Sequence, residues 1–579
     1  MLREEIECDF ENDQSQIKVL KSQEKRIIVE APPGYGKTKL LLGKTVYDLL
    51  DNVPINHEKT LMLTFSNNST SKMRADLYAK LENHAYSLRN WINSKIRITN
   101  YHGLAGGILR KYGFLLDEKL KDLKDIQIVN ENHLKSIDNF NTLIKFKQFV
   151  DNALPGKLFS NVRNYNEVIL NKVLPLNKLT YNSIITLTLQ LLEDKPILLD
   201  LYKKIYTKII IDEFQDTNHL NLRLLELFLH DDIRVELYGD PLQRIYGFIG
   251  TVGNLFDVFG EKYNFNYYTL KSNYRFKGNK FLIDLERRVR SYANDPINAY
   301  NNIKSYSHQN ITIFENQQLE SENVIRIIKE IHQLYPDKKT AILTSQRGPD
   351  INVIKEKLRS NYIAYFDALE INTESNEYRR FCDKCVESFQ MYFSSRKNIV
   401  KKELNEWISV FKSSFELSST QQQNLITLLV AMLQDVVRNR NYRMLNKDEK
   451  YDYILSVFLE YDLHRYLSAV DVSVQLLTIH TSKGLEWDNI FLVDIEKDRL
   501  PSYYGMCSNC SFKSNCNIED IRGNSDNFIE QLSVFYVAIT RARQNAYLSL
   551  SKKNAMCFDT NVSCILNELK IVPIPSFLT

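Results

Sequence analysis

A glycine-punctuated turn that ends in Lys-Thr is the segment of this sequence best suited to chemistry. An apolar run, Arg26–Glu30, leads into a loop made of Ala31, Pro32, Pro33, Gly34, Tyr35, Gly36, Lys37 and Thr38. Glycines let the backbone curl so that successive N–H groups point at phosphate oxygens. In such a loop the lysine reaches the β- and γ-phosphates, the threonine hydroxyl binds Mg²⁺, and the following helix points its positive end at the anion. The sequence therefore predicts a triphosphate site, although Ala31 stands where the motif usually has glycine.

Two acids after another apolar run are expected to complete this chemistry. Asp212 and Glu213 follow a run that ends at Ile211 and reads as a buried parallel strand. We expect Asp212 to hold Mg²⁺ through water, and Glu213 to take a proton from the water that attacks the γ-phosphate. The alternative is a solvated turn, where paired acids are common.

Four further side chains have the right chemistry for the rest of a nucleotide. The Gln16 amide offers the donor and the acceptor that an adenine edge requires. Tyr274 could stack on the adenine, and the neighbouring Arg275 could neutralise γ-phosphate charge. Gln243 follows another strand-like run and could sense the γ-phosphate.

Hydroxyl, amide and aromatic side chains at strand ends are suited to gripping a phosphodiester backbone and stacking bases. The candidates are Thr64, Phe65, Asn67, Tyr246 and Phe248. The alternative reading is a buried Phe65 beside a routine helix cap, and a turn over a packed aromatic pair at Tyr246 and Phe248.

The bulk composition is that of a globular protein with three or four domains in 579 residues. A net charge of +4 is too small to argue for nucleic acid by itself, so any binding track would be a local groove. The charged N-terminal residues do not resemble a signal peptide, and no apolar run is long enough to span a membrane. These features predict a cytoplasmic protein without a membrane partner.

Taken in order, the motifs resemble those of the UvrD/Rep/PcrA group of superfamily 1A helicases. They are Gln16, Ala31 to Thr38, Thr64 to Asn67, Thr99 to Gly103, Asp212 to Asp216, Gly239 to Phe248 and Asn273 to Arg275. Farther along, Val474 to Trp487 resembles the fifth motif of the family and Tyr536 to Arg543 the sixth. The resemblance implies nucleic-acid contacts from Thr99, Tyr101, His102, Thr478 and His480, a ribose contact from Glu486, and an arginine finger at Arg541.

The resemblance also implies an α/β fold with two RecA-like parallel-sheet P-loop domains that use ATP and Mg²⁺. The expected division is 1–103 and 201–275 for the two parts of the first domain, 104–200 for its helical insertion, 276–372 and 469–579 for the two parts of the second domain, and 373–468 for a second helical insertion. Two departures from the family pattern, Ile249 after Phe248 and Leu532-Ser533 before Tyr536, remove expected basic residues.

A cysteine cluster with the spacing C-x₂-C-x₅-C lies between the fifth and sixth motifs. Its members are Cys507, Cys510 and Cys516. Three thiolates so close together can bind zinc or an iron–sulfur cluster if a fourth ligand is available. Cys382 or Cys385 could supply that ligand. The alternative is a loop with free thiols in a reducing compartment.

The family resemblance implies an ATP hydrolase and DNA helicase that moves 3′ to 5′ on single-stranded or tailed duplex DNA, in repair or recombination. Two alternatives stay open. One is a motor subunit of an anti-phage assembly of the Gabija type, with a separate nuclease subunit. The other is a nucleotide-gated module that grips nucleic acid without unwinding it. Nothing substantial follows the sixth motif, so no appended nuclease is expected.

Overall fold

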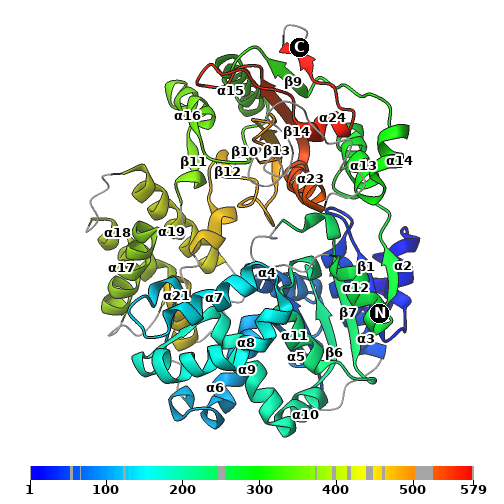
Figure 1. Cartoon of the computed structure of the whole chain (residues 1–579). Helices are drawn as coiled ribbons and strands as arrows, with labels where there is room; N and C mark the ends of the chain where they lie inside the picture. Colours follow the sequence, from blue (N-terminus) through cyan, green and yellow to red (C-terminus); the bar gives the residue numbers. More distant parts are fainter. Residues whose placement is uncertain are drawn as a thin grey trace. The chain divides into compact units, whose positions relative to one another are not determined.

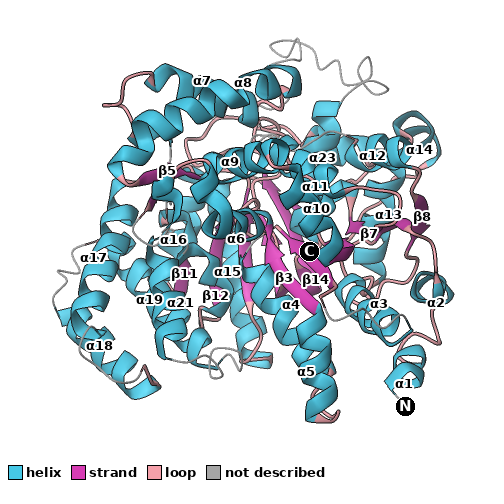
Figure 2. Ribbon diagram, turned by 90° about the horizontal axis from the view of Figure 1, so that it is seen from below, coloured by secondary structure: helices cyan, strands magenta, loops and turns pink. Residues whose placement is uncertain are grey.

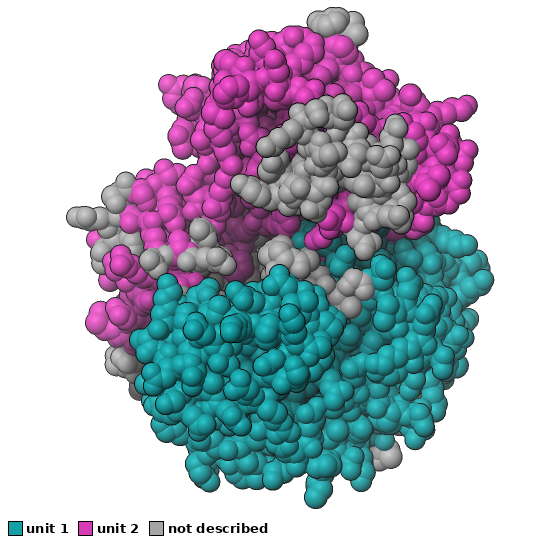
Figure 3. Space-filling model, viewed as in Figure 1, with its two compact units in different colours: residues 1–274 teal, residues 275–579 magenta. Residues whose placement is uncertain are grey.

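The computed structural model describes residues 2–51, 57–65, 67–121, 126–129, 131–245, 254–371, 375–393, 399–413, 419–438, 447–459, 463–502 and 526–576 (Figure 1). The chain divides into two compact units, shown in different colours in Figure 3. Unit 1 is Met1–Tyr274 and unit 2 is Arg275–Thr579. Each unit is described by itself.

Unit 1 is built around a six-stranded parallel sheet. The strand order is β3-β2-β6-β7-β1-β8. The strands are rich in Ile, Leu and Val because parallel sheets are covered by helices on both faces. Their bounds are β1 (Arg26–Glu30), β2 (Lys59–Thr64), β3 (Ile96–Asn100), β6 (Tyr206–Ile211), β7 (Arg234–Gly239) and β8 (Asn266–Thr269).

Alternating side chains of these strands enter two separate apolar clusters, one on each face of the sheet. Ile27, Val29 and Ile210 join one cluster, and Ile28, Ile209 and Ile211 join the other. The first cluster is covered by α1 (Leu2–Cys8), α2 (Gln14–Lys21), α3 (Lys37–Asp51), α4 (Asn67–Lys80) and α5 (Tyr86–Lys95). The second is covered by α6 (Tyr101–Tyr112), α9 (Tyr181–Asp194), α11 (His219–Phe228) and α12 (Leu255–Tyr263).

The segment between β3 and β6 is mainly helical. Besides α6 and α9 it contains α7 (Phe140–Asp151), α8 (Pro155–Val168) and α10 (Pro196–Ile205). It also contains two short strands, β4 (Gln127–Val129) and β5 (Lys178–Thr180), which pair in parallel. These strands were not predicted, because three residues are too few to show the alternation by which a strand is recognised.

Unit 2 has a seven-stranded parallel sheet in the order β11-β12-β10-β13-β14-β9-β15. The strands are β9 (Ile311–Phe314), β10 (Thr340–Thr344), β11 (Tyr365–Asp367), β12 (Val474–Thr478), β13 (Trp487–Leu492), β14 (Ala542–Ser551) and β15 (Ile574–Pro575). Figure 2 shows the strands in the interior with helices around them. The flanking helices include α13 (Lys280–Asn294), α14 (Pro296–Asn302), α15 (Gln317–Leu334), α16 (Pro349–Ser360), α23 (Asp526–Ile539) and α24 (Cys564–Glu568).

Four described helices lie in the chain between β11 and β12. They are α17 (Asn376–Phe393), α18 (Lys401–Ser413), α19 (Thr420–Arg438) and α21 (Lys447–Leu459). Trp407 and Phe389 are in contact at the centre of this helical group, edge to face, with ring centroids 5.2 Å apart. None of the helices described is both long enough and apolar enough to cross a membrane.

The predicted α/β class with two parallel sheets and additional helices is confirmed. The exact domain boundaries given above stay predictions. Five strands that complete the sheets, β8, β9, β11, β14 and β15, were not singled out from the sequence. All of them except β14 are short and lie at or near a sheet edge.

Replacing Gly239 by alanine should destabilise unit 1. A Cβ at this position would lie 2.2 Å from Gln215 Oε1, 2.9 Å from Phe256 Cζ and 3.2 Å from the Phe214 backbone nitrogen. Overpacking of this kind costs about 1–3 kcal/mol. Urea denaturation of Gly239→Ala measures the loss. The matched control is Gly106→Ala within α6, where the nearest atom is 3.9 Å away. There alanine should be neutral or stabilise by up to about 1 kcal/mol, and equal losses in both variants would contradict the packing argument.

Candidate functional site

The loop between β1 and α3 has the backbone that the sequence predicted for a phosphate-binding turn. Gly34 and Gly36 both have positive φ, 85° and 79°, which side-chain-bearing residues rarely adopt. The Tyr35 N–H donates to the Pro32 carbonyl at 3.2 Å. Ala31, in contrast, still pairs with the sheet, since its N–H donates to the Gly239 carbonyl at 2.8 Å and its φ is not positive. Glycine is therefore not required at this position.

Lys37, the first residue of α3, lies between the two acids that follow β6. Its Nζ is 2.9 Å from Asp212 Oδ1 and 2.5 Å from Glu213 Oε1. Burial alone would lower the pKa of Lys37, but the charges of Asp212 and Glu213 outweigh burial and raise it. Burial also raises the pKa of Asp212, against the opposing effect of Lys37. The structure thus brings together one largely buried cation and two carboxylates, and Thr38 is the next residue of α3.

Glu213 is held by an unusual backbone and a short chain of side chains. It has left-handed φ and ψ of 57° and 45°, a strained conformation for a residue with a side chain. Its Oε2 accepts a hydrogen bond of 2.6 Å from Gln215 Nε2, and Gln215 Oε1 accepts one of 3.2 Å from the Asp240 N–H. Gln243 Nε2 in turn donates to Asp240 Oδ2 at 3.3 Å. The chain links Glu213 to the predicted γ-phosphate sensor, Gln243.

Gln215 was missed as a functional candidate. Gln215 lies within the Asp212 to Asp216 motif, but a glutamine beside two acids reads as an ordinary polar residue. The only available signal was its position two residues after Glu213. Its connection to Asp240 depends on the pairing of β6 with β7, which the sequence does not display.

The predicted adenine-side residues gather around the phosphate-binding loop. Gln16 lies in α2 and donates from Nε2 to the Tyr35 carbonyl at 2.9 Å. Tyr274 donates its N–H to the Gly34 carbonyl and its hydroxyl to Asp13 Oδ2, both at 2.8 Å. Partial burial, with the Asp13 bond, raises the pKa of Tyr274 to about 12. The Tyr274 ring is half exposed, which leaves a face for stacking.

In unit 2 the two predicted phosphate-binding arginines have internal partners. Arg275 forms an ion pair with Glu486 and donates to the Thr540 carbonyl at 2.6 Å. Arg543 also pairs with Glu486, at 3.2 Å. Arg541 is buried and donates to the carbonyls of Val537 and Leu485, at 3.0 and 3.2 Å. Their predicted roles toward ATP, including the Glu486 ribose contact, stay predictions, and Arg543 is an addition that the sequence reading missed.

The predicted nucleic-acid residues of unit 1 lie at the ends of two paired strands. Thr64 ends β2 and pairs with Asn100 at the end of β3. Phe65, next in the chain, is 37% exposed. Tyr101 is only 4% exposed and belongs to the apolar core, so the structure gives no support for stacking by its ring.

For the other residues predicted to contact nucleic acid, the structure gives their positions but does not test that role. His102 is half-buried and packs edge to face against Tyr181, and the intermediate exposure of Thr99 beside it does not decide its role. In unit 2, Thr478 ends β12, and burial together with Lys483 lowers the pKa of the nearby His480. The described part of the chain excludes Tyr246, Phe248, Cys507, Cys510, Cys516 and the side chain of Asn67, so the predictions for them stay untested.

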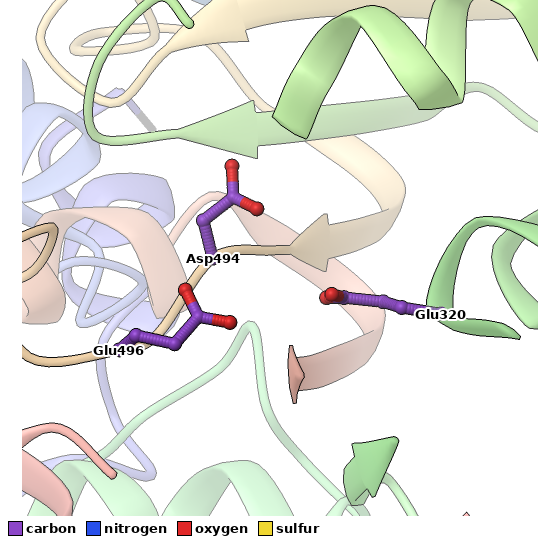
Figure 4. A group of neighbouring side chains, drawn as sticks. All are labelled: Glu320, Asp494 and Glu496. Carbon is purple, nitrogen blue, oxygen red and sulfur yellow. The ribbon is translucent and has the colours of Figure 1, made fainter. Parts of the chain in front are cut away.

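A separate group of acids lies in the core of unit 2. Glu320, Asp494 and Glu496 have carboxylate oxygens within 4.8 Å of one another and are all buried (Figure 4). Ser549 donates to Glu320 at 2.5 Å, Thr344 to Asp494 at 3.2 Å, and the Ser551 N–H to Glu496 at 2.7 Å, all neutral donors.

Burial, followed by repulsion from neighbouring acids, raises all three pKa values. The pKa of Glu320 rises to about 8 and that of Asp494 to about 7. Arg499, which pairs with Asp350, lowers the pKa of Asp494 only in part. Carboxyls in this setting keep protons that they would lose in water.

Two family models match the sequence. The model for the UvrD/REP helicase N-terminal domain matches residues 12–264, and the model for the UvrD-like helicase C-terminal domain matches residues 368–553.

Curated relatives are similar over almost the whole chain. A probable DNA helicase II homolog of Mycoplasma genitalium is 22% identical, with 90% of this chain and 82% of the relative covered. An ATP-dependent DNA helicase Rep of Buchnera aphidicola is 22% identical, with 90% of both chains covered. An ATP-dependent DNA helicase PcrA of Staphylococcus epidermidis is 22% identical, with 92% of this chain and 82% of the relative covered.

The acid group predicts that unit 2 loses stability as the pH rises. Because the folded-state pKa of Glu320 lies above its unfolded value, its stabilisation is complete at low pH and is lost as the pH rises through about 8. Between pH 6 and pH 8 the free energy of unfolding should fall by about 2 kcal/mol from this group alone. Urea denaturation across this range measures the slope.

Glu320→Gln keeps the shape of the side chain but cannot ionise, so this variant should show a shallower pH dependence. The control is Glu322→Gln, an exposed acid on the same helix, which should keep the wild-type slope. An unchanged slope in Glu320→Gln would contradict a raised pKa of Glu320 as the cause of the pH dependence.

Proposed function

Because the chain belongs to the UvrD/Rep group of superfamily 1A helicases, we propose that it is a motor that moves 3′ to 5′ along single-stranded DNA. The family resemblance read from the motifs is confirmed. As a member of this family the chain is an ATP-dependent DNA helicase that uses ATP and Mg²⁺ and binds DNA. The direction of movement and a role in repair or recombination belong to the proposal.

The observation that carries the proposal is the position of Lys37 between Asp212 and Glu213. An ammonium group paired with two acids suits a site that must accept a triphosphate and a divalent cation and then exchange partners. ATP supplies the free energy of phosphoanhydride hydrolysis when it is bound. In our proposal Lys37 and the N–H groups of the loop neutralise phosphate charge, Thr38 and Asp212 hold Mg²⁺, and Glu213 accepts the proton of the attacking water.

The residues around the loop fit such a ligand. Gln16 and Tyr274 flank Gly36 closely, since a Cβ there would lie 2.8 Å from Gln16 Nε2 and 3.7 Å from the Tyr274 ring. The half-exposed Tyr274 ring and the Gln16 amide lie on the same side of the loop, which supports their proposed roles in stacking on and reading the adenine.

The DNA track in our proposal uses residues at strand ends in both units. In unit 1, Thr64 ends β2 and Phe65 follows it. In unit 2, Thr478 ends β12 and His480 comes two residues later. His480 is neutral near pH 7 because burial lowers its pKa, so it would contribute a hydrogen bond and a ring face rather than charge. The exposed Phe65 ring supports stacking on a base.

Glu213→Gln should abolish DNA-stimulated ATP hydrolysis while leaving ATP binding largely intact. The amide keeps the size of the side chain but cannot accept the proton, and loss of a general base costs about 10²–10⁴ in rate. Steady-state ATP turnover with and without single-stranded DNA measures the effect. Glu118→Gln, an exposed acid of unit 1, is the control and should behave as wild type. ATP turnover that DNA does not stimulate in the wild type would favour the alternative of a nucleotide-gated switch.

Direction is tested with duplexes that carry a single-stranded tail at one end only. The proposal expects strand displacement from a 3′-tailed duplex and little from a 5′-tailed one. The reverse preference would refute the proposed direction, and no displacement from either substrate would leave only translocation or a switch.

Gln215→Leu should lower kcat for ATP about tenfold with little change in KM. The substitution removes the hydrogen bond that orients the Glu213 carboxylate, and a positioning contact of this kind acts mainly on the chemical step. Thermal unfolding of the same variant checks that the protein stays folded at the assay temperature. A raised KM with unchanged kcat would contradict an orienting role.

Two finer predictions keep their own tests. A zinc ion or iron–sulfur cluster at Cys507, Cys510 and Cys516 would be detected by elemental analysis of the purified protein. A separate nuclease subunit, as in an anti-phage assembly, would be detected by co-purification from the native host.

A further inference from the structure

Four charged side chains are buried together between α3 and the strands β6 and β7, outside the motifs. They are Lys44 and Asp48 on α3, Lys208 on β6 and Glu236 on β7, and each is at most 7% exposed. We call this group the buried ion network. It contains two positive and two negative charges, and none of the nucleotide or DNA roles described above uses it.

Direct contacts connect all four side chains. Lys208 Nζ is 2.5 Å from Asp48 Oδ2 and 2.6 Å from Glu236 Oε1. Lys44 Nζ is 3.2 Å from Asp48 Oδ2 and 3.8 Å from Glu236 Oε1. Tyr238 donates its hydroxyl to Glu236 Oε2 at 2.9 Å. Lys208 is thus held by two acids, just as Lys37 is held by Asp212 and Glu213.

The periodicity of the two elements explains why these contacts align with the catalytic ones. Residues seven and eleven positions apart share one face of a helix, so Lys37, Lys44 and Asp48 all face the sheet. Alternate residues of a strand point to one side, so Lys208 and Asp212 share a face of the sheet. Two ion pairs therefore join α3 to β6 and the residue that follows it. In the first pair α3 supplies the cation, Lys37, and in the second it supplies the acid, Asp48.

The network also reaches the other elements that carry nucleotide-binding residues. Lys44 donates to the carbonyls of Ser22 and Leu20, at 2.8 and 3.4 Å, where α2 ends. Helix α2 begins near Gln16, the predicted adenine reader. Glu236 lies on β7, the strand that leads to Asp240 and Gln243. One set of buried charges thus contacts α2, α3, β6 and β7 together.

A buried ion network is a poor device for stability alone. Removing charges from water costs several kcal/mol per ion, and well-packed apolar residues of similar volume often stabilise a protein as much or more. Burial lowers the pKa of Lys208, but the charges of Glu236 and Asp48 outweigh burial and raise it, which favours the charged form of Lys208. Ion pairs and hydrogen bonds have preferred geometries, whereas apolar packing does not. A buried ion network can therefore fix the register between the elements that it joins.

We propose that the buried ion network is a positioning device that keeps α3 in register with β6 while Lys37 exchanges its acid partners for the phosphates of ATP. The inference rests on the proposed function. When Lys37 leaves Asp212 and Glu213, the ion pairs at that end of α3 are lost, and the pairs of Asp48 and Lys208 remain. They hold the phosphate-binding residues of α3 at the right distance from Asp212 and Glu213, the proposed Mg²⁺ ligand and general base that follow β6.

The test compares Lys208→Met, Asp48→Leu and the double variant that carries both substitutions. Each single variant leaves one buried charge uncompensated and should lose stability. The double variant restores charge balance and should regain most of that stability. If the network positions the site, kcat for DNA-stimulated ATP hydrolysis stays low in all three, by about tenfold to a hundredfold, because small misplacements act on the chemical step. KM for ATP should change less than about threefold.

A matched control is available in unit 2. Lys355 and Asp367 form a buried ion pair of 2.7 Å that contacts none of the candidate site residues, and Lys355 also pairs at 2.7 Å with the exposed Glu370. Lys355→Met leaves Asp367 buried without its cation and should lose stability. The double variant with Asp367→Leu should regain most of that stability, and both variants should keep wild-type kcat per folded molecule. Thermal unfolding and active-site titration of every variant supply the folded fraction.

The outcomes separate the inference from the function on which it rests. Wild-type kcat in the Asp48→Leu/Lys208→Met protein, once corrected for the folded fraction, would overturn the positioning role, as would an equal loss of kcat in the unit 2 controls. Wild-type protein whose ATP turnover does not respond to DNA would instead overturn the proposed motor. If the single variants do not fold, the charge-balanced double variant still decides the question.

Discussion

The contact of Lys37 with Asp212 and Glu213 is the interaction on which the rest of the structure depends. It joins the start of α3 to the end of β6, the two elements that must act on one triphosphate. The glycines of the loop bring Lys37 to this place, and the left-handed backbone at Glu213 turns its carboxylate toward the ammonium group. A largely buried cation held by two acids is stable without a nucleotide. It is also ready to exchange partners, because the phosphates of ATP can replace the acids beside Lys37 and Mg²⁺ can replace Lys37 beside the acids.

What the sequence predicted well is what lies close together along the chain. The loop from Ala31 to Thr38 and the acids after Ile211 carry their chemistry in consecutive residues, and parallel strands deliver both to the same edge of a sheet. The contacts that tie the site together are different. They join residues that are far apart in the sequence, and some depend on the register between strands, which a single sequence does not show. Examples are the contacts of Gln215 with Asp240, Arg275 with Glu486, and Asp48 with Lys208.

Burial was the other limit on prediction. Tyr101 follows a strand that ends near the predicted DNA track, yet the first turn of α6 points its ring into the core. Lys208 precedes the apolar run of β6 and was given no role from the sequence, whereas in the structure α3 supplies its acid partner, Asp48. In both cases the outcome depends on which helix packs over the strand, a tertiary choice that local pattern and propensity do not determine.

The most direct test of this account is a structure of the protein with Mg²⁺ and a non-hydrolysable ATP analogue. The account predicts that Lys37 Nζ leaves Glu213 Oε1, from which it is now 2.5 Å, and contacts a phosphate oxygen, while Lys208 and Asp48 stay 2.5 Å apart. A structure in which Lys37 keeps both acids and the phosphates bind elsewhere would contradict the account.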